Sequence, residues 1–248
     1  MILADIGMLA VSSNRTKYYL YQMAKHNLFP SIVLYMEDSY VTTVEQQVTS
    51  ACTERKPSYL HGIDLNISVL DLLTDLKVSY EHIPSIDPNS KLVVEAVSRC
   101  DPSVLLYSGP GGAILRDEVL NTGKRFLHIH SGYLPYYRGS TTIYYSLLNE
   151  GNCGATAFFL DKSIDMGPII MKKKYPPPEN TETIDLYYDP FIRSELLIEV
   201  LKEYVRRGEL PCEMQDINAG ETYFIIHPVL KHVAILSSRK RYKEIQVQ

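Results

Sequence analysis

The sequence lacks the cysteine patterns of a metal site or a disulfide framework. Its four cysteines are far apart, include no C-x-x-C pair and do not stand beside a histidine at metal-ligand spacing. No apolar run approaches the roughly 20 residues of a membrane span. The N-terminus also has no basic region before its short apolar stretch. These absences predict a cytoplasmic protein with no bound metal and no membrane partner.

An excess of positive charge and a glycine-rich phosphate loop are also missing. The formal net charge is −4, whereas nucleic-acid-binding proteins usually carry a concentrated basic excess. The polar turn at residues 12–16, after the first apolar run, contains no glycine, so neither G-x-G-x-x-G nor the Walker pattern is present. We therefore expect no nucleic-acid partner and no ordinary NAD or ATP site.

Strand patterns alternate with helix patterns along most of the chain. Residues 1–11 and 31–36 are apolar runs of strand length that flank a helix expected at 17–26, which predicts a βαβ unit with parallel strands. Residues 38–65 are expected to form a surface excursion. Further strands are expected at 78–83, 103–108, 125–130, 155–160 and 169–175, and helices at 69–76, 89–99, 113–120, 140–149 and within 182–207. The pattern predicts an α/β protein.

The strand expected at residues 125–130 ends in a polar, turn-rich segment. His128 and His130 are at the end of that strand, where two imidazoles pass from the sheet into a loop. Gly132, Pro135 and Gly139 then prevent regular structure. Open α/β sheets bind ligands where such strands end, so this segment is the candidate site.

This segment, together with a second one about 35 residues later, resembles the folate-dependent formyltransferase family. That family includes the glycinamide ribonucleotide, methionyl-tRNA and amino-sugar N-formyltransferases. The matching residues are Ile129, His130, Leu134, Pro135, Tyr137, Arg138 and Gly139, followed by Asp165, Gly167, Ile169 and Ile170. The resemblance implies a Rossmann-like α/β fold with a mostly parallel sheet, a catalytic domain at 1–178, and a small helical and strand extension at 179–248 packed on it.

The resemblance also implies an activity. The family moves a formyl group from 10-formyltetrahydrofolate, a co-substrate, to a primary amine. The amine must lose a proton, the leaving N10 atom must gain one, and charge on the carbonyl oxygen must be stabilised. His130 matches the family histidine, which accepts the amine proton and helps to polarise the formyl group. Asp165 matches the aspartate that orients that histidine or stabilises its charge.

His128 departs from the family pattern, which has asparagine at this position. An asparagine amide donates a neutral hydrogen bond to the formyl oxygen, whereas the donor of a histidine ring sits elsewhere. Three interpretations stay open: a substitute donor, a changed preference for acceptor or donor, or a weakly active or inactive homologue that still binds folate or a nucleotide.

The resemblance places the folate pocket in two loops. Carried onto this chain, the folate-binding residues are Gly112, Ala113, Ile114, Leu115, Asp161, Lys162, Ser163 and Ile164. A flat pterin ring needs backbone donors and acceptors at its edge and apolar walls at its faces. The alternative is that the first loop is only a tight turn that opens a helix.

The acceptor amine is expected to bind near the first turn of the chain. Ser13, Asn14 and Arg15 provide groups that can hold a phosphate at a helix N-terminus. Amino-sugar formyltransferases have a similar loop, so the resemblance implies a nucleotide-linked amino sugar as the acceptor, with glycinamide ribonucleotide or an aminoacyl group as alternatives. The oligomeric state stays open, with a homodimer as one option.

Overall fold

The computed structural model describes residues 1–38, 62–181, 183–216 and 218–246. Most of the surface excursion expected at 38–65, including Cys52, lies outside the described residues. Among the described residues, no helix is both long enough and apolar enough to cross a membrane.

The centre of the fold is a seven-stranded sheet with the order β10-β9-β7-β6-β2-β4-β5. Neighbouring strands run parallel from β5 to β7, while β9 is antiparallel to β7 and β10 is antiparallel to β9. The strands are β2 (Ile6–Val11), β4 (Val33–Met36), β5 (Tyr80–Ile83), β6 (Val104–Ser108), β7 (Arg125–His130), β9 (Cys153–Phe159) and β10 (Ile169–Tyr175). The expected α/β class with a mostly parallel sheet is confirmed.

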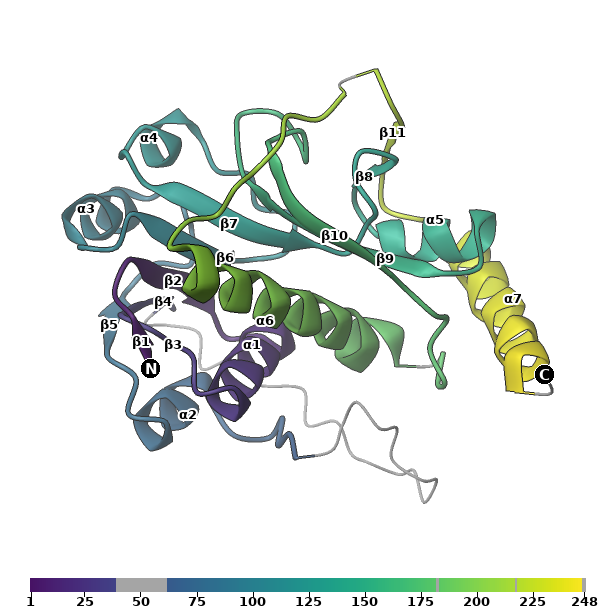
Figure 1. Cartoon of the computed structure of the whole chain (residues 1–248), viewed down its shortest axis with the longest axis horizontal. Coiled ribbons are helices and arrows are strands. Elements are labelled where there is room, and N and C mark those ends of the chain that lie inside the picture. Colours follow the sequence, from purple (N-terminus) through teal and green to yellow (C-terminus); the bar gives the residue numbers. More distant parts are fainter. Residues whose placement is uncertain (39–61, 182, 217, 247–248) are drawn as a thin grey trace.

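Helices cover both faces of this sheet (Figure 1). One face carries α1 (Asn14–Lys25), α2 (Val69–Asp75) and α6 (Asp189–Arg207), and α1 and α6 pack against each other. The other face carries α3 (Lys91–Arg99) and α4 (Asp117–Leu120). Strand β2 is buried throughout because its alternating side chains enter both cores: Met8 packs on the α1 and α6 side, and Leu9 packs on the α3 side.

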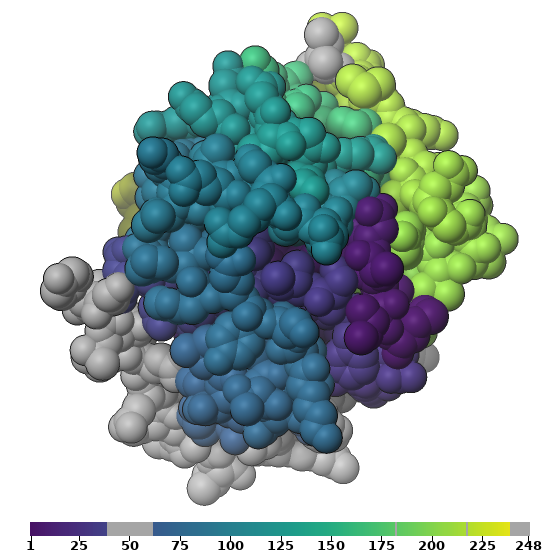
Figure 2. All heavy atoms as spheres, turned by 90° about the vertical axis from the view of Figure 1, so that its left-hand side faces the viewer, coloured from purple at the N-terminus to yellow at the C-terminus, as the bar shows by residue number. Residues whose placement is uncertain are grey.

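Part of the last third of the chain packs against the main sheet. A π-helix, η2 (Ile184–Tyr188), leads into α6, whose Ile192 and Leu196 are fully buried in the larger core. Figure 2 shows the N-terminal residues (purple) beside the yellow-green residues at the end of α6 and just after it. The division into units 1–178 and 179–248 stays a prediction, and α6 joins the second of them to the main core.

Two strands and two helices frame the region after β7. Strand β8 (Tyr137–Gly139) pairs in parallel with β11 (Glu221–Tyr223), and α5 (Thr142–Asn149) packs against α7 (Pro228–Gln246), which ends at the right of Figure 1. A small parallel pair, β1 (Ile2–Leu3) and β3 (Phe29–Pro30), lies beside the main sheet. The loop after the histidines is therefore bordered by the C-terminal part of the chain.

The helix expected at 113–120 starts four residues later than predicted, at Asp117. The Asn89 side chain donates to the carbonyl of Ile114 over 2.9 Å and accepts from the amide of Arg116 over 2.7 Å. These bonds satisfy backbone groups that a helix would otherwise use. A side chain distant in sequence therefore keeps residues 113–116 out of the helix.

Candidate active site

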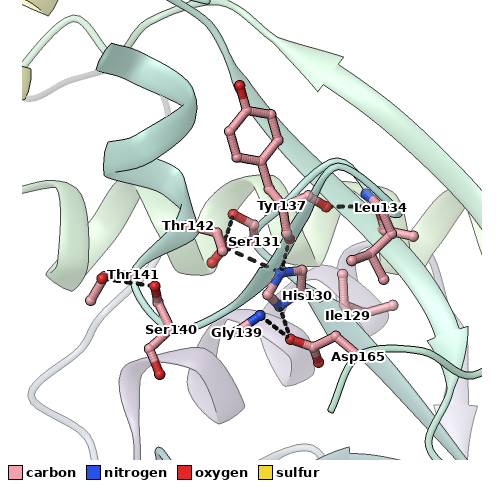
Figure 3. A network of polar contacts seen from close by, with 12 residues as sticks. Ile129, His130, Ser131, Leu134, Tyr137, Gly139, Ser140, Thr141, Thr142 and Asp165 are labelled. Atoms are coloured by element: carbon pink, nitrogen blue, oxygen red, sulfur yellow. Dashed lines mark hydrogen bonds and ion pairs between the residues drawn. The ribbon is translucent and has the colours of Figure 1, made fainter. Parts of the chain in front are cut away.

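The structure brings His130 and Asp165 together at the end of β7. Nδ1 of His130 lies 3.5 Å from Oδ2 of Asp165, and both side chains are largely buried, at 6% and 13% exposure (Figure 3). On its other side, the ring has Nε2 2.8 Å from the carbonyl oxygen of Tyr137 and 3.2 Å from Oγ1 of Thr142. Internal groups therefore face both ring nitrogens of His130.

Asp165 is held by the backbone around it. Its φ is +52°, in the left-handed region, and its Oδ2 accepts from the amide of Gly139 over 2.7 Å. Gln215 donates from Nε2 to the carbonyls of Asp165 and Gly167 over 3.0 and 2.7 Å. The carboxylate is therefore tied to the loop that follows the histidines, and the backbone of Asp165 is tied, through Gln215, to the C-terminal part of the chain.

The two glycines of the matching motifs are required by close backbone approaches. A Cβ on Gly167 would lie 1.8 Å from the carbonyl oxygen of Phe159, and one on Gly139 would lie 2.1 Å from that of Tyr223. Gly139 also has a φ of +93°, which other residues rarely adopt. The segment containing Asp165 is thus packed directly on β9, and the loop after the histidines on β11.

His128 occupies a different environment from His130. Its Nδ1 lies 3.3 Å from the carbonyl oxygen of Tyr107. Its ring packs against the rings of Tyr107 and Phe158, with centroids 5.9 and 5.8 Å away. Burial, with the positive charges of Arg15 and Arg193, holds the pKa of His128 well below its ordinary value, so the ring is neutral near pH 7.

Two arginines approach this region: Arg15, which was expected at the acceptor site, and Arg193, which was not expected at any site. Arg193, from α6, donates to the carbonyl of Ile129 and to the hydroxyl of Ser131, each over 2.7 Å. Its Nε lies 2.9 Å from the carboxylate of Asp189. Sequence reasoning missed Arg193; the one signal was the i, i+4 spacing of Asp189 and Arg193 in a helix pattern.

The residues expected to bind the acceptor lie at the start of α1. Ser13 caps the helix by accepting from the amide of Thr16 over 3.1 Å, and Asn14 donates to the carbonyl of Leu186 over 3.1 Å. Arg15 donates to Oγ of Ser108 over 3.2 Å and to the carbonyl of Gly109. Burial, and then the neighbouring Arg193, lower the pKa of Arg15. These three residues therefore join the start of α1 to the end of β6 and to η2.

The two loops expected to bind folate are brought together by an ion pair. Nζ of Lys162 lies 3.0 Å from the carboxylate of Asp117, the residue that starts α4. Ile114 and Ile164 are half exposed, at 56% and 49%, whereas Leu115 is buried. Gly111 and Gly112 have open space where a Cβ would stand. The loops thus present exposed apolar side chains and uncovered backbone.

Of the remaining expected folate residues, Asp161 and Ser163 form a local turn. The amide of Ser163 donates to the carboxylate of Asp161 over 2.8 Å. Ala113 likewise donates from its amide to the carbonyl of Pro110, over 3.3 Å. No three His, Cys, Asp or Glu side chains of the described segments are placed to hold a metal ion.

Comparisons with known proteins agree on one family. Residues 91–200 match the family model described as formyl transferase. A methionyl-tRNA formyltransferase from Chloroflexus aurantiacus is 34% identical over 141 residues, which are 54% of this chain and 45% of that protein. The chain therefore spans about half the length of this curated relative.

Solved structures of this family share the fold. An N-formyltransferase from Helicobacter canadensis, in complex with folinic acid and dTDP-3-aminofucose, superposes with a TM-score of 0.57 at 16% identity, covering 97% of this chain and 82% of its own. A glycinamide ribonucleotide transformylase from Symbiobacterium toebii gives 0.55 at 17% identity, covering 85% and 93%. Residues 91–200 are thus similar in sequence to formyl transferases, and the chain shares the fold of solved members of that family.

Proposed function

We propose that this chain transfers a formyl group from 10-formyltetrahydrofolate to the primary amine of a nucleotide-linked amino sugar. The observation that carries the proposal is the pairing of His130 with Asp165, 3.5 Å apart at the end of a buried strand. The carboxylate orients the imidazole, and together they form a polar centre, sheltered from water, that can stabilise charge at the reacting carbonyl.

Two loops are suited to the folate. The exposed side chains of Ile114 and Ile164 provide apolar surface for the faces of a pterin, and the uncovered backbone at Gly111 and Gly112 provides edge groups. When bound, the folate supplies the formyl group. The eight expected folate-binding residues are proposed on this basis.

The sugar nucleotide is favoured by the polar start of α1. Backbone amides at a helix N-terminus attract phosphate, and Ser13, Asn14 and Arg15 add polar groups there. The relative from Helicobacter canadensis was solved with a dTDP-linked amino sugar. A second candidate acceptor is an aminoacyl group, because the sequence relative from Chloroflexus aurantiacus is named as a methionyl-tRNA formyltransferase.

The test is formyl transfer by the purified chain. The protein is incubated with 10-formyltetrahydrofolate and one acceptor at a time: a dTDP-linked amino sugar, glycinamide ribonucleotide or methionyl-tRNA. We expect release of tetrahydrofolate and a formylated product only with the sugar nucleotide. Release only with another acceptor would move the proposal to that acceptor, and folate binding without release would indicate a binding protein.

A further inference from the structure

The ring of His128 is held in one tautomer by its surroundings. A carbonyl oxygen can only accept a hydrogen bond, so the contact between Nδ1 and the carbonyl of Tyr107, at 3.3 Å, requires the hydrogen on Nδ1. Because the ring is neutral, Nε2 then carries a lone pair and no hydrogen. Nε2 of His128 is therefore a hydrogen-bond acceptor.

This acceptor is open to a ligand. Within the described residues, Nε2 of His128 has no hydrogen-bond partner, and it is not among the enclosed polar atoms that lack one. His130 differs, because its Nε2 faces the Tyr137 carbonyl and its Nδ1 faces Asp165. Of the two imidazoles, His128 is thus the one with a ring nitrogen that faces no internal group of the described residues.

We propose that His128 takes the proton of the attacking amine on Nε2 and passes it to the leaving nitrogen. This inference rests on the proposed formyl transfer. It excludes the substitute-donor interpretation of His128, since an Nε2 without hydrogen cannot donate to the formyl oxygen. It assigns the proton-acceptor part to His128 and leaves charge stabilisation to His130 with Asp165.

The step balances without any further reagent. The amine nitrogen uses its lone pair to form a bond to the formyl carbon, and the carbonyl π electrons move to oxygen. The nitrogen, now positively charged, gives a proton to Nε2 of His128. The bond from the formyl carbon to N10 breaks, its electron pair stays on N10, and the proton on Nε2 neutralises it while the carbonyl re-forms.

A neutral imidazole suits this task. A neutral amine does not lose its proton to such a base, but the proton becomes acidic once nitrogen has bonded to the formyl carbon. The neutral imidazole then accepts this proton and gives it to N10 as the bond to N10 breaks. The aromatic rings of Tyr107 and Phe158 keep the imidazole in place. The position of His128 therefore suits the transfer of a proton from the amine to N10 within one active site.

The first test reads the tautomer directly. Histidine ring nitrogens of the full chain are labelled with nitrogen-15, and the His128 signals are assigned by their loss in His128→Asn and, independently, in His128→Gln. We expect a protonated Nδ1 and an unprotonated Nε2 at neutral pH. A hydrogen on Nε2 would overturn the proposal, whatever the activity of the chain.

The second test compares rates. With the acceptor that the wild type uses, His128→Asn and His128→Gln should lower kcat by about 100-fold or more while changing KM by less than about threefold, because an amide cannot take up the proton. An active His128→Asn variant would overturn the inference and leave the proposed function intact. An inactive wild type would instead refute the proposed function.

Discussion

Arg193 donates from Nη1 to the backbone carbonyl of Ile129, over 2.7 Å, and so fixes the peptide unit between His128 and His130. The same guanidinium reaches Ser131 through Nη2 and the carboxylate of Asp189 through Nε. A planar, multidentate donor of this kind sets the position of the strand end, which a single ammonium cannot do. Helix α6 thereby positions the end of the strand that carries the histidines.

Replacing Arg193 should therefore disturb the histidines. We expect Arg193→Ala to lower kcat by about 100-fold through misplacement of the rings, and to destabilise the fold by about 3–5 kcal/mol because Asp189 loses its buried partner. Arg193→Lys should restore most of the stability and less of kcat. The control is Arg206→Ala on the same helix, whose ion pair with Glu203 is on the surface. Unchanged His128 and His130 ring signals in Arg193→Ala would contradict the positioning role.

The pairing of His130 with Asp165 makes a second prediction. Asp165→Asn and His130→Gln should each lower kcat by about 10²- to 10⁴-fold, because charge stabilisation at the reacting carbonyl is lost. Folate binding, measured by calorimetry, should be retained in both variants. Asp71→Asn, which alters an exposed carboxylate in the first turn of α2, should keep wild-type kcat. Wild-type kcat in Asp165→Asn would refute the role of the pair.

The neutral ring of His128 makes stability depend on pH. Its pKa in the folded chain is well below the value near 6.5 that the unfolded chain has. Below about pH 6.5 the unfolded chain therefore binds a proton that the folded chain does not, and the free energy of unfolding falls as pH falls, by up to about 1.4 kcal/mol per pH unit from this residue. Thermal melts from about pH 7.5 down to about pH 5 should show a larger drop in Tm for the wild type than for His128→Gln. Equal drops would show that His128 is not the cause.

Gly167 and Gly111 form a matched pair for a packing test. A Cβ on Gly167 would meet the carbonyl of Phe159 at 1.8 Å, whereas a Cβ on Gly111 would meet nothing within 4 Å. Gly167→Ala should lower the free energy of unfolding by about 1–3 kcal/mol or more, and Gly111→Ala by well under 1 kcal/mol. Denaturant unfolding of the two variants measures the difference. Equal stability would contradict the close packing of the Asp165 segment on β9.

The resemblance to formyltransferases was the basis for expecting that His130 and Asp165 meet, and the structure places them 3.5 Å apart at the end of β7. His130 and Asp165 lie in short segments whose glycines and proline restrict the backbone, so local sequence carries much of the geometry. Arg193 could not be predicted in the same way. An arginine in an amphipathic helix is usually on the surface, and only the packing of α6 on β7 gives this one a buried backbone partner.

The short strands β8 and β11 also could not be predicted from the sequence. Each has three residues, too few for a periodic pattern, and β8 contains Gly139. Their pairing depends on tertiary contacts between segments far apart in the chain. The C-terminal helix α7 was expected only as part of a small extension, because its sequence has little amphipathic character on which to base a helix boundary.

Because β8 pairs with β11, the loop after the histidines can complete its contacts only late in synthesis. The guanidinium of Arg138 donates to the carbonyl of Gly220 over 3.2 Å, across 82 residues of chain. The amide of Ser140 donates to the carbonyl of Tyr223, and that of Ile226 to Oγ1 of Thr141. The ribosome releases the histidines long before it releases these partners. A nascent chain that already contains both His130 and Asp165 therefore still lacks the strand that closes the loop between them.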